Sequence, residues 1–159
     1  MSNEEVLIAN ALAVWKSVYE RADKLFAGLE DGELSKHVAP DRNRLIYLLG
    51  HLTALHDRML VLLGLGERIL PDLDAFFVSA PDGAKDLPAA TEVRAAWKLV
   101  GERLNSGIAG FSLSQWLEKH TAVSEEDFEK DPLRNRLSIL LTRTNHLSYH
   151  LGQAMLARR

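Results

Sequence analysis

The sequence predicts an all-α fold, an antiparallel four-helix bundle with a long crossover between the second and third helices. Apolar residues recur at helical spacing in four long stretches, each bounded by residues that start or stop helices. Signals for β-strands are few, because no alternating apolar run is bounded by hairpin turns. The chain of 159 residues contains no internal repeat or linker, which indicates a single domain over residues 1–159.

Capping residues and glycines set the expected bounds of the four helices. Ser2, with a Glu three residues later, opens the first helix with a capping box, and Asp131 before Pro132 is a strong start signal for the last. The expected helices cover about residues 2–28, 41–63, 91–107 and 132–157. The crossover, residues 71–88, contains three Pro and is expected to be mostly loop. We expect a short helix around residues 113–119, followed by polar loop.

Composition and charge exclude several classes of protein. Cysteine is absent, which rules out disulfides, zinc ribbons and a protein thiol nucleophile. The net charge is −3 and no basic cluster is present, so we expect no nucleic-acid partner. No apolar run approaches the roughly 18 residues that a membrane span requires, so we expect no membrane association. The start of the chain is acidic where a signal peptide would be basic, which leads us to expect a cytoplasmic protein.

The second and fourth helices are apolar on more than one side. In the second, Leu48 and Leu55 lie on one side, and Leu45 and Leu52 lie roughly on another. A helix that is apolar on nearly every side is either deeply buried or shared with a partner. We therefore expect a homodimer that uses part of the second or fourth helix. The alternative is that the crossover covers this surface within the chain.

Three of the six histidines form the candidate site. His146 and His150 are four residues apart in the last helix, so both imidazoles project from one face, as in helices that chelate transition metals. His51 lies in the middle of the second helix after Gly50, and a glycine there indicates a close backbone approach. Three imidazoles from two helices would leave coordination positions open, as catalytic metal sites do. The alternative is that all three are structural histidines with hydrogen-bond partners.

The order of these elements resembles the DinB-like family of four-helix-bundle proteins. The likeness lies in residues 50–58 and 145–153, which hold a histidine in the second helix and a His-x-x-x-His motif followed by Gly-Gln, the most diagnostic fragment. It covers almost the whole chain. The resemblance implies that His51, His146 and His150 bind a divalent transition metal, either zinc, nickel or iron, with water or substrate completing the coordination. Relatives include thiol-dependent S-transferases and a thiol-using isomerase, and the bundles are often dimers.

We therefore predict a divalent-metal-dependent enzyme, with thiol S-transfer as the first hypothesis. An ion with an open position binds a low-molecular-weight thiol, lowers its pKa and so prepares it to attack a small electrophile. Arg58 and Arg143 are candidates for holding a substrate carboxylate or phosphate, although a surface salt bridge is the alternative for each. Tyr149 and Gln153 are candidates for orienting a bound water or substrate.

Three other functions are compatible with the same residues. Hydrolysis by metal-bound hydroxide ranks lower, because no Glu or Asp is well placed as a general base, and Asp57 lies on a different helix face from His51. A metal- or small-ligand-binding stress-response protein without turnover would have the same ligand positions. A structural bundle without a metal would use the histidines for packing alone.

Overall fold

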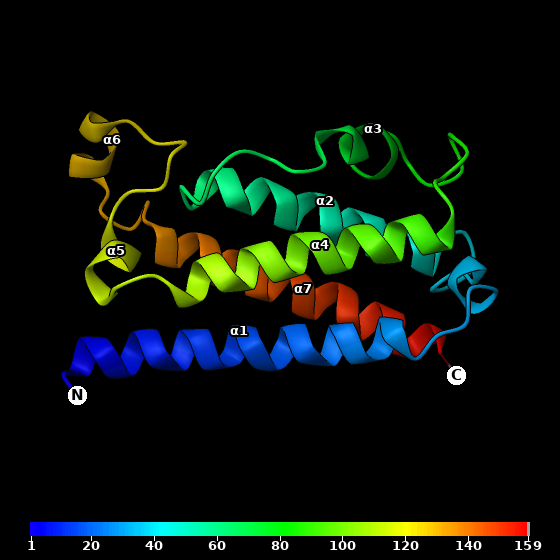
Figure 1. Cartoon of the computed structure of the whole chain (residues 1–159), viewed down its shortest axis with the longest axis horizontal. Helices are drawn as coiled ribbons and strands as arrows, with labels where there is room; N and C mark the ends of the chain where they lie inside the picture. Colours follow the sequence, from blue (N-terminus) through cyan, green and yellow to red (C-terminus); the bar gives the residue numbers. More distant parts are fainter. Residues whose placement is uncertain (159) are drawn as a thin grey trace.

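In a computed structural model that describes residues 1–158, the protein is helical and contains no β-strand within this range. Two isolated β-bridges are present, His37–Arg44 and Lys119–Asn135. Four long helices run along the molecule (Figure 1): α1 (Asn3–Ala27), α2 (Leu45–Leu62), α4 (Ala90–Ala109) and α7 (Arg136–Ala157). The predicted all-α bundle is confirmed.

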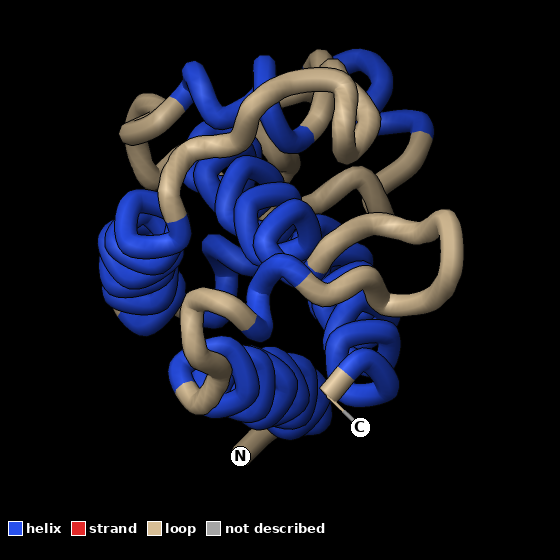
Figure 2. Tube along the Cα trace, turned by 90° about the vertical axis from the view of Figure 1, so that its right-hand side faces the viewer, coloured by secondary structure: helices blue, strands red, loops and turns tan. Residues whose placement is uncertain are grey.

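The crossover sets the directions of the four helices. α1 and α7 run one way along the bundle, and α2 and α4 run the other way (Figure 1). Because α2 and α4 are parallel neighbours, the chain between them returns over the whole length of α2. Figure 2 shows the bundle end-on, with this returning segment lying outside the helices. It contains the turn η2 (Pro71–Leu73) and the short helix α3 (Asp74–Phe77).

Two further segments hold short helices. Between α1 and α2 lies the turn η1 (Glu33–Ser35), and between α4 and α7 lie α5 (Leu113–Leu117) and α6 (Glu125–Lys130). α5 falls where a short helix was expected. α6 replaces the expected polar loop, since the Ser124 side chain accepts a hydrogen bond from the backbone N–H of Asp127 and caps a helical turn.

The second helix begins later than Pro40-Asp41 predicts. The backbone N–H of Val38 donates to the Asn43 carbonyl at 3.0 Å, and that of Leu45 donates to the Lys36 carbonyl at 2.9 Å. Asp41 has a φ of 59°, in the left-handed region, which turns the chain between the two paired segments. The Pro40-Asp41 signal therefore belongs to a turn that precedes α2.

The start signal at Asp131-Pro132 is likewise part of a turn. The Asp131 carboxylate accepts a hydrogen bond from the Leu133 backbone N–H at 3.1 Å. Asn135 caps α7 instead, because its side-chain oxygen accepts from the Ser138 backbone N–H at 2.9 Å. The predicted end of this helix near Ala157 is correct.

α2 is the central helix of the bundle. Thirteen of its 18 residues are buried, and it packs against α3, α4 and α7. By length and composition alone α2 could cross a membrane. The sequence did not indicate this, because polar residues interrupt the apolar run. Of its residues, 72% are buried inside the bundle, and this accounts for its apolar character.

The crossover covers part of the outer surface of α2. Phe77 of α3 is 0% exposed, and Tyr47 of α2 donates its hydroxyl to the Ala80 carbonyl at 2.7 Å. The alternative interpretation therefore holds for this part of α2, because the chain covers it itself. The homodimer prediction now depends on α7, whose Leu141 and Met155 are about half exposed.

Candidate metal centre

The structure brings together the three histidines that the sequence singled out. His51 projects from α2, and His146 and His150 project from α7. The Nε2 atom of His146 lies 3.3 Å from Nε2 of His51 and 3.1 Å from Nε2 of His150. Nitrogen ligands at about 2.0–2.1 Å from a tetrahedral ion would be about 3.3 Å apart. All three rings are partly buried, and one donor atom from each lies within 4.8 Å of the others.

Hydrogen bonds to the opposite ring nitrogens fix two of the imidazoles. Nδ1 of His51 lies 2.8 Å from the Phe77 carbonyl oxygen, which can only accept, so this Nδ1 carries the proton. Nδ1 of His150 lies 2.7 Å from Oε1 of Gln153, and the amide nitrogen of Gln153 in turn donates to the Tyr149 hydroxyl at 3.3 Å. Both Nε2 atoms therefore present lone pairs to the space that the triad surrounds, as metal ligands do.

This donor set fits a divalent cation. His146 has one Nε2 hydrogen at most, so it can donate to only one of the two lone pairs that face it. Burial lowers the pKa of all three imidazoles, with the neighbouring histidines lowering that of His146 further, to about 4. The neutral form, which a metal requires, is thus favoured at pH 7. No carboxylate joins the cluster within residues 1–158, so the protein offers three ligands of one type.

Gly50 gives the crossover access to His51. A Cβ on Gly50 would overlap the Phe77 side chain, whose ring lies directly against the α2 backbone. The same Phe77 supplies the carbonyl that holds Nδ1 of His51. The close backbone approach predicted from Gly50 is therefore the contact between α2 and α3. This contact places the Phe77 carbonyl so that it orients His51.

The Gly50→Ala variant is expected to bind metal about 10- to 100-fold more weakly, although no ligand is changed. The added methyl displaces Phe77 and with it the carbonyl that orients His51, at a cost of about 1–3 kcal/mol in stability. Metal affinity by competition with a chelator and urea unfolding measure the two effects.

Gly152→Ala is the matched control for Gly50→Ala, because a Cβ on Gly152 of α7 would meet nothing within 4 Å. It is expected to stabilise the helix by about 0.5–1 kcal/mol. Equal stability and equal metal affinity for the two variants would contradict the positioning role of Gly50.

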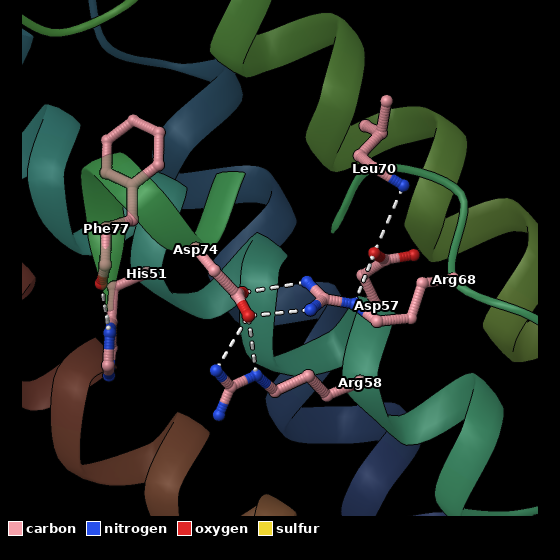
Figure 3. Close-up of polar contacts among 7 residues, drawn as sticks. All are labelled: His51, Asp57, Arg58, Arg68, Leu70, Asp74 and Phe77. Atoms are coloured by element: carbon pink, nitrogen blue, oxygen red, sulfur yellow. Dashed lines mark hydrogen bonds and ion pairs between the residues drawn. The ribbon is translucent and has the colours of Figure 1, made fainter. Parts of the chain in front are cut away.

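A partly buried network of acids and arginines anchors the crossover (Figure 3). Asp57 of α2 is 0% exposed and accepts hydrogen bonds from Arg68 at 3.0 Å and from the backbone N–H groups of Ile69 and Leu70 at 2.8 and 3.1 Å. Arg68 also forms a two-bond pair with Asp74 at 2.6 and 2.8 Å. As predicted, Asp57 lies away from the triad; its role is to hold the chain that leads to α3.

The two arginine candidates differ in their surroundings. Arg58 forms a two-bond ion pair with Asp74 at 2.7 and 3.1 Å, so the salt-bridge alternative holds for it (Figure 3). Arg143, one turn before His146 on α7, is partly buried and has no ion pair or side-chain hydrogen bond within residues 1–158. Burial, and to a lesser extent Arg58, lower its pKa.

The other two substrate candidates, Tyr149 and Gln153, belong to the support of His150. The side-chain oxygen of Gln153 accepts a hydrogen bond from Nδ1 of His150. Tyr149, which is 63% exposed, packs edge-on against the same ring. A cavity of about 260 Å³ adjoins them, and its other walls come from the turn before α2. Its lining residues are Val38, Asp41, Arg42, Asn43, Tyr149, His150 and Gln153. Sequence reasoning missed this turn, since Pro40-Asp41 was interpreted as a helix start.

The remaining histidines lie outside the triad. His37 is exposed, and His120 lies in the segment between α5 and α6. His56 is buried against the rings of Trp15 and Trp97, and burial lowers its pKa to about 3. It is a core histidine on the other side of α2 from the triad.

Comparison with known proteins identifies the family. The model of the DinB superfamily matches residues 15–154, a segment that includes all three histidines and most of the chain. A search of curated proteins found no match. The likeness inferred from the motifs around His51 and His150 is thus confirmed at the level of the family: the chain belongs to the DinB superfamily.

Proposed function

We propose that the protein is a divalent-metal-dependent enzyme that joins a low-molecular-weight thiol to a small electrophile. The observation that carries the proposal is the convergence of three imidazole nitrogens, two of them with lone pairs fixed by Phe77 and Gln153. One of the three histidines, His150, also lines a cavity. His51, His146 and His150 would hold zinc, nickel or iron. The bound ion would supply Lewis acidity that lowers the pKa of a thiol.

In the proposed reaction the sulfur nucleophile comes from outside the chain. The sequence contains no cysteine, so the sulfur nucleophile has to be a second small molecule. In the proposed reaction the thiol releases its proton to water and its sulfur forms a bond to the electrophilic carbon. The leaving group departs with the electron pair of the bond that breaks. Tyr149 and Gln153 keep Nδ1 of His150 protonated through this exchange.

Turnover of the loaded protein tests the proposal. Protein purified without a histidine tag is analysed for metal, then loaded separately with zinc, nickel and iron. Each form is given 2-mercaptoethanol or mercaptoacetate together with chlorodinitrobenzene or chloroacetamide, and loss of free thiol is followed. We expect the metal-loaded protein to consume thiol faster than the uncatalysed reaction. Metal-free protein should not raise the rate above the uncatalysed one.

A metal-binding protein without turnover is the second candidate. The same three ligands and the same supporting hydrogen bonds would serve it. Stoichiometric metal with no thiol consumption over the whole panel would contradict the transferase proposal and favour this candidate. Absence of metal from the wild-type protein under all loading conditions would contradict both.

A further inference from the structure

Arg143 lies beside the triad and has no ion-pair or hydrogen-bond partner for its side chain among residues 1–158. It lies three residues before His146 on α7, a spacing that places both side chains on one face of the helix. The side chain is partly buried, so water compensates its charge less well than at the surface. Most partly buried arginines in this protein bind a carboxylate or a carbonyl, as Arg44 does with Asp82.

The two acids of the Arg58–Arg68 network are already paired with other groups. Asp74 accepts two hydrogen bonds from Arg58 and two from Arg68. Asp57 accepts one from Arg68 and two from backbone N–H groups. Arg58, the charged group that lowers the pKa of Arg143, is thus itself paired with Asp74 and brings no negative charge to Arg143. Within residues 1–158 the positive charge of Arg143 beside His51 and His146 has no paired acid.

We infer that Arg143 binds a carboxylate of the ligand that occupies the triad site. The inference rests on the proposed function, since it names the chemical class of the substrate: a small thiol or a small electrophile that carries a carboxylate. A guanidinium forms two parallel charge-assisted hydrogen bonds to such a group. The ligand would thus be held at two points, by Arg143 at its anionic end and at the triad by its reacting end.

Matched thiols test the inference by binding rather than by activity. Mercaptoacetate carries a carboxylate, and 2-mercaptoethanol does not. Calorimetry with metal-loaded protein is expected to show at least about tenfold tighter binding of mercaptoacetate. Arg143→Gln should remove this preference and leave metal content and the affinity for 2-mercaptoethanol unchanged. Arg158→Gln, an exposed arginine at the end of the same helix, should retain the preference.

The electrophile could carry the carboxylate instead of the thiol. With 2-mercaptoethanol as the thiol, chloroacetate and chloroacetamide are acceptors that differ in charge. If the carboxylate belongs to the electrophile, Arg143→Gln raises KM for chloroacetate about tenfold and leaves KM for chloroacetamide unchanged. In that case the two thiols bind equally well to the wild-type protein.

Binding of acetate to metal-free protein tests this inference independently of the proposed function. The Nε–H resonance of Arg143, assigned by its loss in Arg143→Gln, is expected to shift on titration with acetate in nitrogen-15 NMR spectra. A shift without any thiol turnover would contradict the transferase and keep the anion site. No shift with acetate, together with a charge preference that survives in Arg143→Gln, would overturn the inference whatever the enzyme does.

The stability of Arg143→Gln distinguishes binding from a structural role. Removal of an unpaired, partly buried charge is expected to leave the unfolding temperature unchanged or to raise it. A clear loss of stability would show that Arg143 holds the fold and would count against the inference.

Discussion

His146→Ala is expected to weaken metal binding at the triad by two to three orders of magnitude, about 100- to 1000-fold. His146 is the central ligand candidate, because its Nε2 lies within 3.3 Å of Nε2 of both other histidines. Apparent binding energies of about 10–16 kcal/mol for structural zinc, shared over three or four ligands, give roughly 2.5–5 kcal/mol for each, with a middle value near 3–4 kcal/mol. Loss of one ligand should therefore weaken binding by about 100- to 1000-fold. Metal content after dialysis and competition with a chelator measure this loss.

The control for His146→Ala is a histidine outside the triad. His56→Leu removes a buried imidazole from the opposite side of α2, where its ring contacts Trp15 and Trp97. This variant should bind metal as the wild type does. Circular dichroism should show that both variants remain helical. A His146→Ala protein that keeps one tightly bound ion per chain would place the metal elsewhere.

Asp57→Ala is expected to destabilise the protein by about 3–5 kcal/mol, a change measured by urea unfolding. Asp57 is 0% exposed, and its carboxylate compensates Arg68 and two backbone N–H groups of the crossover. Alanine would leave all three donors without their acceptor in a region that water reaches poorly. Asp57→Asn should cost less, because the amide oxygen can still accept hydrogen bonds.

The same variant links the crossover to the metal centre. Arg68 joins Asp57 to Asp74, and α3 continues from Asp74 to Phe77, the residue whose carbonyl orients His51 (Figure 3). We therefore expect Asp57→Ala to lower metal affinity as well. Asp127→Ala, which removes an exposed ion pair, should change stability by no more than about 0.5 kcal/mol. Equal stability of the two variants would contradict the anchoring role of Asp57.

Local sequence signals were sufficient for most of the helices. The capping box at Ser2 and Glu5 and the glycine at residue 28 bound α1 as predicted, because the atoms involved are at most four residues apart. The predictions failed at two helix starts, where the residues that carry the cap signal form a turn instead. Pro40-Asp41 forms a turn because the chain on either side pairs with itself, and Asp131 lost the cap of α7 to Asn135.

The metal centre likewise has one part that local sequence determines and one part that packing determines. That His146 and His150 share a face follows from the helical repeat, so the sequence alone determined this pair. That His51 meets them depends on how α2 is rotated about its axis, which packing against α3, α4 and α7 decides. Gly50 made His51 the third candidate in the sequence, and the family motif includes the same residue.

The sequence by itself determined an all-α bundle, a helical histidine pair and an unusual glycine at residue 50. Only the tertiary structure decided that Gln153 supports His150 and that, among residues 1–158, Arg58 is paired and Arg143 is not. The physical reason is range. Helix geometry and capping act between residues a few positions apart, whereas ion pairs and ring orientations depend on Asp74 and Phe77, which the crossover brings back over α2.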